Sequence, residues 1–418
     1  MKDFFINKDR VKRRLKELAE FGMNEYGGID RSIGSDSDVE ARKFLIDILK
    51  NQIGAYVKID PIANIFAEVK GNENLKPITL GSHHDAVPNG GKFDGALGVL
   101  LAIEVVQRIT EEKIKMRHPL QIVSFSAEEP NPYNISTLGS RVATGKVSKE
   151  QVKKAKNKDD GTMLSQALKR IGGNADVLED ALLKKNDMSA FIECHIEQGR
   201  ILFDKKESVG VVKKITGIYR EEIRVLGEAN HAGTTLMKYR HDSFLSTAEA
   251  ALKLERIVKE VNREDVVGTV GRVNVFPNSA NIISGDVEFI IEIRTPNNEI
   301  KEEIIRKFTL SLKDIEEKRN VKFERKVILN QAEVNMDKDI INALKSSIEE
   351  LGMPVIDMVS MAGHDSVHMC DITKTGMLFV QSIDGKSHCK EENTDMKDIE
   401  RAGNVLLNTV LKLDKEVD

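Results

Sequence analysis

Short apolar runs alternate with helical patterns in the first third of the chain. Residues 63–69 (ANIFAEV), 77–84 (PITLGSHH) and 119–129 (PLQIVSFSAEE) have the pattern of strands, and residues 94–111 have the spacing of a helix. Strands that alternate with helices predict crossover connections and a largely parallel sheet, that is, an α/β fold. Such sheets bind ligands at the carboxyl ends of their strands, which is where GSHHD and SAEE fall.

The pattern changes at about residue 213. The chain then predicts a strand, a helix, two strands, a helix and a strand, at 217–226, 241–262, 266–275, 287–294, 299–318 and 321–327. This order is typical of a ferredoxin-like sandwich. We therefore expect a separate domain in the middle of the chain.

The length of the chain agrees with more than one domain. At roughly 150 residues per domain, 418 residues predict two to three domains. We expect one domain over residues 213–330, inserted into another formed by residues 1–212 and 331–418, with the segment from 335 rejoining the first sheet. Residues 146–188 are rich in Lys and Asp and are expected to form solvated outer helices.

Composition and charge exclude several classes of protein. The chain has 63 Lys and Arg against 67 Asp and Glu, a net charge of −4, so nucleic acid is not expected as a partner. The most apolar stretch, residues 96–106, contains Gly98 and Glu104 and is too short to span a membrane. The charged N-terminal segment and three scattered cysteines predict a cytoplasmic protein without disulfides.

Histidines and carboxylates cluster in the segment GSHHDAVPNGGKFDGALG. His83 and Asp85 lie two residues apart on an extended segment, so their side chains share a face. An imidazole that binds metal needs an acceptor for its second nitrogen, and Asp85 is placed to be that acceptor. Asp94 follows a glycine-rich turn at the start of a helix, where it can bridge two cations or, alternatively, cap the helix.

Further candidate ligands follow at other strand ends. Glu128 and Glu129 are adjacent carboxylates that would repel each other without cations or a shared proton. One can bind metal while the other is a general base, although a solvated acidic turn is the alternative. With His195 and His388, these residues fit a pair of divalent cations with nitrogen and oxygen ligands. A lone histidine is more often structural, so the prediction depends on the whole set.

Taken together, the motifs resemble those of a known group of enzymes. The chain is similar to the allantoate amidohydrolases and N-carbamoyl-L-amino-acid hydrolases, within the aminoacylase and carboxypeptidase superfamily of dinuclear metallohydrolases. The resemblance covers nearly the whole chain and rests on GSHHDAVPNGGKFDGALG, FSAEEP, HIEQG, GEANHAGTT, PNSANIISGDVEFIIEIR, AGHD and SHCKEENT. HIEQG, NHAGTT and PNSAN are the narrower markers of the branch that cleaves ureido groups.

The resemblance implies a role for each matching residue. One metal would be held by His83, Asp94 and His195 and the other by Asp94, Glu129 and His388, with Zn, Mn or Co as the ions. Glu128 would be the base, and Asp85 would be a further catalytic residue. The inserted domain would be a lid and dimerisation domain, from which His231 reaches the neighbouring subunit's site and stabilises the oxyanion. The substrate would be bound by Gln198, Asn281, Arg294 and His364.

These roles imply hydrolysis of a ureido carbon–nitrogen bond in an N-carbamoyl amino acid or allantoate, with release of ammonia and carbon dioxide. Arg294 can grip a substrate carboxylate bidentately, but an ion pair with Glu292 or Glu288 is its alternative. Considered without the motif, His231 would be an ordinary histidine of a loop, and the AGTT segment after it would form a turn. The rival functions are a dipeptidase or aminoacylase and a catalytically silent binding protein.

Some residues depart from the group or fall outside its motifs. Residues 130–133 (PNPY) replace the usual Gly-Ser-Arg-Phe, and Leu236, Cys389 and His84 also differ from the common pattern. No motif includes His118, His241 or His368, so we expect these and His84 to be structural or at the surface. Cys194 neighbours His195 on the opposite face of a strand, so we expect it to pack in the core and not to act as a nucleophile.

Overall fold

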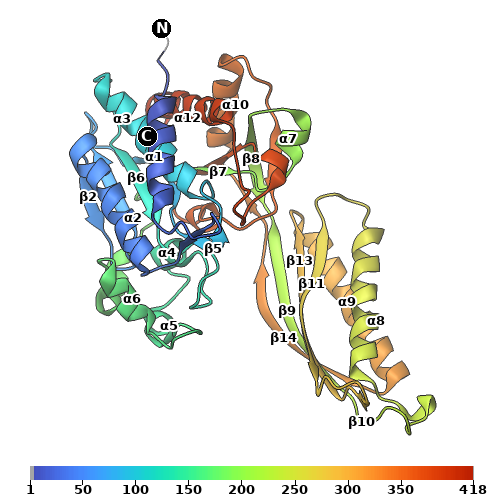
Figure 1. Cartoon of the computed structure of the whole chain (residues 1–418). Coiled ribbons are helices and arrows are strands. Elements are labelled where there is room, and N and C mark those ends of the chain that lie inside the picture. The colour runs from blue at the N-terminus through green and yellow to red at the C-terminus, as the bar shows by residue number, and fades with distance from the viewer. Residues whose placement is uncertain (1–3, 418) are drawn as a thin grey trace. The chain divides into compact units, whose positions relative to one another are not determined.

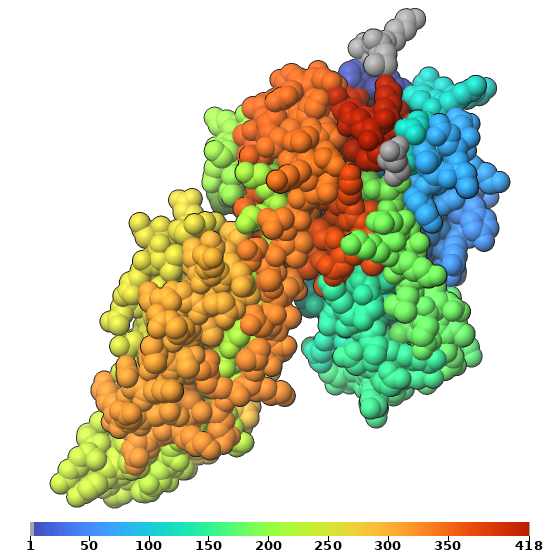
Figure 2. All heavy atoms as spheres, turned by 180° about the vertical axis from the view of Figure 1, so that it is seen from behind, coloured from blue at the N-terminus to red at the C-terminus, as the bar shows by residue number. Residues whose placement is uncertain are grey.

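The computed structural model describes residues 4–417, which form two compact units. The first unit holds the described residues up to Lys213, then Asn335–Met358 and the chain from Gly363. The second unit holds Lys214–Val334 with the short segment Val359–Ala362. Figure 2 shows the end of the chain, in red, packed beside the blue segments of the first unit.

A mixed sheet forms the centre of the first unit (Figure 1). Its four central strands are mutually parallel and lie in the order β17, β7, β4, β6. Antiparallel strands flank them, with β8 next to β17 and β3 next to β6. The predicted α/β fold with a largely parallel sheet is therefore confirmed. Within residues 4–417 the strands of this sheet are β2 (Tyr56–Ile59), β3 (Ile65–Val69), β4 (Ile78–His83), β6 (Leu120–Phe125), β7 (Ala190–Ile196), β8 (Val209–Ile215), β15 (Val334–Asn335), β16 (Asp357–Ser360) and β17 (Thr375–Val380).

Apolar residues explain why these strands are central. Every residue of β4, β7 and β17 is buried, as expected for parallel strands that are covered on both faces. The helix α3 packs against β4, β6 and β7, and α10 and α12 pack against β17 and each other. The longer helices of this unit are α1 (Lys8–Glu20), α2 (Asp36–Asp47), α3 (Ala96–Glu111), α10 (Lys338–Glu350) and α12 (Met396–Glu416). Short elements complete it: β1 (Ile29–Arg31), β5 (Ala86–Gly90), η1 (Ile48–Gln52), α7 (Ile201–Lys205), α11 (Ser366–Met369) and η4 (Ile383–Gly385).

The segment 146–188 is helical but only partly solvated. Its helices are α5 (Lys149–Lys154), α6 (Leu164–Arg170) and η2 (Ala175–Ala181), and α4 (Leu138–Ala143) precedes them. Val152, Leu164 and Leu168 belong to a buried apolar cluster that these helices share. The expected outer helices are present, with Lys and Asp residues on their exposed side, but apolar residues at helical spacing point inward and pack into this cluster.

An antiparallel sheet and two helices form the second unit. The sheet order is β11, β13, β9, β14, and α8 and α9 pack on it and on each other. Buried and partly buried residues alternate along β13. The buried ones, Val287, Phe289, Ile291 and Ile293, belong to the core under the helices. The elements are β9 (Gly217–Leu226), α8 (Ser243–Glu260), β11 (Val267–Phe276), β13 (Asp286–Thr295), α9 (Asn298–Arg319) and β14 (Lys322–Gln331), with β10 (Asn230–His231), β12 (Ile282–Ile283) and η3 (Met237–Tyr239) as short additions.

Within residues 4–417, no helix combines the length and the apolar composition needed to cross a bilayer.

Candidate metal centre

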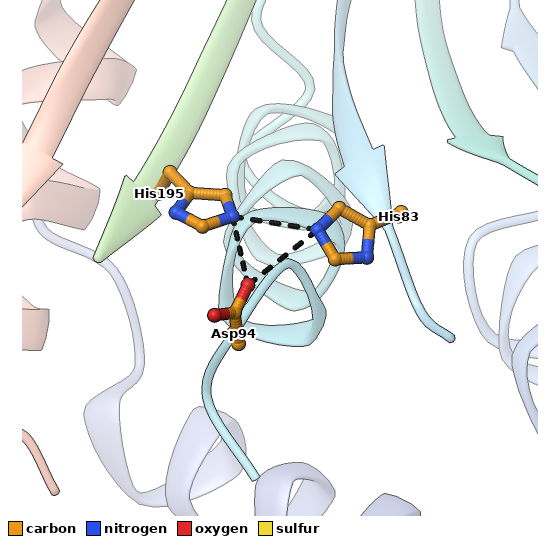
Figure 3. A group of neighbouring side chains, drawn as sticks. All are labelled: His83, Asp94 and His195. Carbon is orange, nitrogen blue, oxygen red and sulfur yellow. Dashed lines mark hydrogen bonds and ion pairs between the residues drawn. The ribbon is translucent and has the colours of Figure 1, made fainter. Parts of the chain in front are cut away.

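Two adjacent parallel strands bring the first group of candidate ligands together. His83 is the last residue of β4, and His195 is the penultimate residue of β7. Because β4 and β7 are parallel, their carboxyl ends meet at one edge of the sheet. Asp94 lies just before α3 and points at both imidazoles (Figure 3). The expected places of His83 and His195 at strand ends, and of Asp94 at the start of a helix, therefore match their positions.

Short distances join these three side chains, all of them buried. Asp94 Oδ1 lies 3.0 Å from His195 Nε2 and 3.6 Å from His83 Nε2, and the two ring nitrogens are 3.4 Å apart (Figure 3). The close approach requires a glycine at 95, since a Cβ there would lie 2.3 Å from the His83 ring. Gly95 also has a φ of +61°, which side chains other than glycine rarely adopt.

The second group shares Asp94. Its other oxygen, Oδ2, lies 3.3 Å from His388 Nε2, which is itself 3.3 Å from Glu129 Oε1. His388 comes from the loop between η4 and α12, and its side chain is 45% exposed. Asp94 makes no side-chain cap to α3, so the helix-cap alternative is not what the structure contains. Instead, its two oxygens face two separate sets of ligand atoms.

Glu128 lies beside these groups. It is 8% exposed and its Oε2 is 3.7 Å from His83 Nε2, while Glu129 is 4% exposed. The alternative of a solvated acidic turn is therefore wrong. Burial raises the pKa of Glu128 well above its usual value, and the charges of Glu129 and Asp365 raise this pKa further against the opposing charge of His83. A carboxyl group with a raised pKa is suited to exchanging protons near neutral pH.

Asp85 connects the first histidine to the paired glutamates. Its Oδ1 lies 3.5 Å from His83 Nδ1. The same carboxylate accepts hydrogen bonds from the backbone N–H groups of Glu128 and Glu129, each at 3.1 Å. Asp85 can therefore orient the His83 ring and the two glutamates at once, which is more than the sequence predicted for it.

The donor atoms suit divalent cations. The ligand atoms of His83, Asp94 and His195 lie within 4.8 Å of one another, as do those of Asp94, Glu129 and His388. Asp94 Oδ1 and Glu129 Oε1 are buried and accept no hydrogen bond from the residues described. Buried carboxylate oxygens without a hydrogen bond are costly unless a cation or a proton compensates them. Nitrogen and oxygen ligands of this kind are typical of zinc, manganese and cobalt sites.

Two further predicted residues lie at the same site. Gln198 Nε2 donates to Asp94 Oδ2 at 2.7 Å, and Gln198 Oε1 is buried without a hydrogen-bond partner among the described residues. The His364 ring packs edge-on against His195, with the ring centroids 4.6 Å apart. Gln198 therefore contacts the candidate ligands directly, and His364 backs one of them.

His231, Asn281 and Arg294 belong to the second unit. His231 is exposed, and its Nδ1 accepts the N–H groups of Gly233 and Thr234, so the local turn weighed from the sequence is present. The carbonyl of Asn281 accepts the N–H of Ala232. The Arg294 Nε lies 2.6 Å from Glu292, which is one of its expected alternatives, and Nη1 donates to the Met361 carbonyl at 2.7 Å.

Comparison with known proteins identifies the family. A model of the Peptidase family M20/M25/M40 matches residues 79–412. The chain belongs to this family. It is 33% identical to an N-carbamoyl-L-amino-acid amidohydrolase from Pseudomonas sp. (strain NS671), over 99% of this chain and all of that protein. It is 34% identical to an Arabidopsis thaliana ureidoglycolate hydrolase, over 96% of this chain and 86% of that protein.

A solved structure agrees with this membership of the M20/M25/M40 family. A hydantoinase/carbamoylase family amidase from Burkholderia multivorans superposes with a TM-score of 0.89 at 30% identity, over 98% of both chains. The resemblance inferred from the sequence motifs is thus confirmed, and the chain is a hydrolase.

Histidines outside the family motifs are held by other partners. His84 is buried between Asp38 and Ser124, and His118 bonds the carbonyls of Lys76 and Val417. Cys194 is buried, and burial raises the pKa of its thiol, as expected for a packing residue. Sequence reasoning missed Ser387, whose hydroxyl donates to Asp94 Oδ2, and Glu392. Glu392 is a buried carboxylate that bonds the backbone of Asp94, and its position in SHCKEENT gave no signal beyond that motif.

Cation uptake is expected to release protons at neutral pH. Nearby carboxylates raise the pKa of His83 and His195, and Asp94 and Glu129 raise that of His388 to about 11. A cation binds the neutral imidazole, so protons on these rings must leave and apparent affinity should rise with pH. Calorimetric titration of Zn²⁺ at pH 7.5 in buffers of different ionisation enthalpy should show net proton release. A binding enthalpy independent of the buffer would contradict this.

Proposed function

We propose that this chain hydrolyses a ureido carbon–nitrogen bond in a small acid, such as an N-carbamoyl amino acid or allantoate. Ammonia and carbon dioxide would be released. The observation that carries this proposal is the buried Asp94, whose two oxygens face separate sets of histidine and carboxylate ligands next to Glu128. The named activities of the relatives support the ureido group as the bond that is cleaved.

In this proposal, Asp94 would bind both of two divalent cations. His83 and His195 complete one set of ligands, and Glu129 and His388 complete the other. Divalent cations bound there would polarise the substrate carbonyl and make water more acidic. Zn, Mn and Co all accept such nitrogen and oxygen donors. Gln198 would turn its amide from Asp94 towards the substrate.

Glu128 would move the proton during the reaction. It takes a proton from the attacking water, whose oxygen forms a bond to the carbamoyl carbon. The bond from this carbon to the terminal nitrogen then breaks, Glu128 returns the proton to the departing ammonia, and the carbamic acid that remains would lose carbon dioxide. Asp85 keeps the backbone of Glu128 in place through its hydrogen bond. Burial supports this role, because it keeps the proton affinity of Glu128 high enough to accept the proton near neutral pH.

The second unit would be a ferredoxin-like lid and dimerisation domain. His231 would donate a hydrogen bond to the developing oxyanion in the neighbouring subunit's site. Arg294 and Asn281 would bind the carboxylate and the ureido group of the substrate, respectively. The exposure of His231 and Asn281 in this unit supports roles in binding. The protein would act in the cytoplasm as a homodimer.

Arg294→Ala is expected to raise KM by about 10- to 100-fold and to change kcat less, because a bidentate carboxylate contact of about 1.5–3 kcal/mol is lost. Steady-state kinetics with an N-carbamoyl amino acid would measure this. Arg224→Ala is the matched control, since Arg224 is an arginine of the same sheet that pairs with Asp286. Equal effects of the two substitutions would limit Arg294 to a structural role, through its contacts with Glu292 and the Met361 carbonyl.

Mixed dimers test the assignment of His231. His231→Ala and Glu128→Gln are each expected to be nearly inactive, but a mixture of the two should regain activity through sites that combine intact halves. Each variant alone is the control, and mass spectrometry of tagged chains would verify exchange. Exchanged dimers without regained activity would place His231 in its own chain's site or outside catalysis.

A substrate panel tests the proposed function itself. The protein, loaded with Zn²⁺, Mn²⁺ or Co²⁺, is assayed for ammonia release from N-carbamoyl amino acids, allantoate and ureidoglycolate, and for cleavage of dipeptides and N-acyl amino acids. The proposal predicts ammonia from at least one ureido compound and little cleavage of the amides. Preferential cleavage of dipeptides or acyl amides would favour a peptidase or aminoacylase, and binding without turnover would favour a silent homologue.

A further inference from the structure

Glu392 lies next to the shared carboxylate, although 298 residues separate it from Asp94 in the chain. It is 2% exposed. Its Oε1 accepts two consecutive backbone N–H groups, from Phe93 at 2.8 Å and from Asp94 at 3.1 Å. These two bonds fix the backbone immediately before α3, at the residue that both groups of candidate ligands share.

Ser387 links Glu392 to the carboxylate of Asp94. Its hydroxyl lies 2.8 Å from Asp94 Oδ2 and 3.2 Å from Glu392 Oε2. Ser387 is also the residue before His388, so one short loop supplies a candidate ligand and two of the groups that hold Asp94. Within that loop, Glu392 N–H donates to the carbonyl of Cys389, which closes the turn that directly follows His388.

The loop between β5 and α3 makes room for Glu392 because it has a glycine at position 91. A Cβ on Gly91 would lie 2.0 Å from the carboxyl carbon of Glu392. Any side chain at 91 would therefore push this buried carboxylate away from the Phe93 and Asp94 amides.

We propose that Glu392 is a positioning residue, which holds the backbone and, through Ser387, the carboxylate of Asp94 so that its two oxygens face the two sets of ligands. The inference rests on the proposed function, because it assumes that Asp94 bridges cations. It concerns how the bridge is held and is independent of which ureido compound is cleaved. Partners that orient a metal ligand in this way affect metal affinity by about 10- to 100-fold.

The chain offers a closely matched control. Asp414 is also a buried carboxylate, 6% exposed, that accepts two consecutive backbone N–H groups from a distant loop, those of Arg117 and His118. It contacts no candidate ligand in the hydrogen bonds and ion pairs described. Removing Asp414 therefore removes the same kind of backbone support without touching the bridge.

The test compares metal binding in the wild type, Glu392→Ala, Glu392→Gln, Gly91→Ala and Asp414→Ala. Dissociation constants for Zn²⁺ come from competition with a chromogenic chelator, and the visible spectrum of the Co²⁺ form reports ligand geometry. Denaturant unfolding of the metal-free proteins gives their stability. We expect Glu392→Ala and Gly91→Ala to weaken Zn²⁺ binding by about 10- to 100-fold and to alter the Co²⁺ spectrum.

Glutamine should rescue binding in Glu392→Gln, because its carbonyl oxygen still accepts the two backbone N–H groups and its amide N–H can donate to the Ser387 oxygen, which leaves the Ser387 hydroxyl to donate to Asp94. Asp414→Ala should lose stability and keep wild-type affinity and spectrum. Unchanged affinity and spectrum in both Glu392→Ala and Gly91→Ala would overturn the proposal and leave Glu392 a structural residue. If Glu392→Ala does not fold, Gly91→Ala alone decides. A wild type that fails to bind two ions would instead contradict the proposed function.

Discussion

Glu128→Gln is expected to lower kcat by about 10²- to 10⁴-fold while the protein keeps two bound cations. Glutamine has nearly the same shape as glutamate and cannot accept the proton of the attacking water. Glu128 belongs to neither group of candidate ligands, so its replacement should leave both groups complete. The bond from its backbone to Asp85 does not depend on the side chain and should survive.

Turnover of a ureido substrate and metal content, measured on the same sample, check this expectation. Glu104→Gln is the control, since Glu104 is a fully buried glutamate that pairs with Arg10 away from the candidate ligands. That variant should lose stability and, once folded, keep its kcat. Near-normal turnover by Glu128→Gln would remove Glu128 from the role of base, and loss of metal would make it a ligand.

Asp94→Ala is expected to abolish binding of both cations, and activity with it. Asp94 is the one residue common to both groups, whereas His195 and His388 each belong to a single group. His195→Ala and His388→Ala should therefore each weaken one ion selectively. The difference between the shared and unshared ligands is the signature of a bridge.

Metal content after dialysis against a weak chelator distinguishes these variants. We expect no bound ion for Asp94→Ala and about one for each histidine variant, because a bridging carboxylate and the remaining ligands can still hold one ion. His118→Ala is the control, as His118 is buried and bonds only the backbone carbonyls of Lys76 and Val417. Retention of one ion by Asp94→Ala would show that Asp94 does not bridge.

Much of the candidate centre could be predicted from the sequence because its residues sit at strand ends. His83 and His195 end two neighbouring parallel strands, and a parallel sheet brings such ends together whatever their distance in the chain. Paired glutamates after a third apolar strand supplied the expected carboxylates. His388 was expected near a strand end, but it lies in a loop between η4 and α12 and has a positive φ, so its motif was the signal that held.

Other features depend on contacts that no local pattern encodes. Glu392 is one of two adjacent glutamates in a charged loop, and only the folded chain shows that it bonds Asp94. The outer helices of residues 146–188 were expected to be solvated because their Lys and Asp residues dominate the composition, while a smaller apolar stripe determines their packing. The partner of Arg294 was open between Glu292 and Glu288, and the short distance to Glu292 depends on rotamers.

The position of bound metal tests the central claim most directly. Anomalous diffraction at the zinc edge, from crystals of the Zn²⁺-loaded protein, should show two peaks on either side of the Asp94 carboxylate. We predict that one peak is bound by His83 and His195 and the other by Glu129 and His388. A single peak, or peaks away from Asp94, would contradict the account.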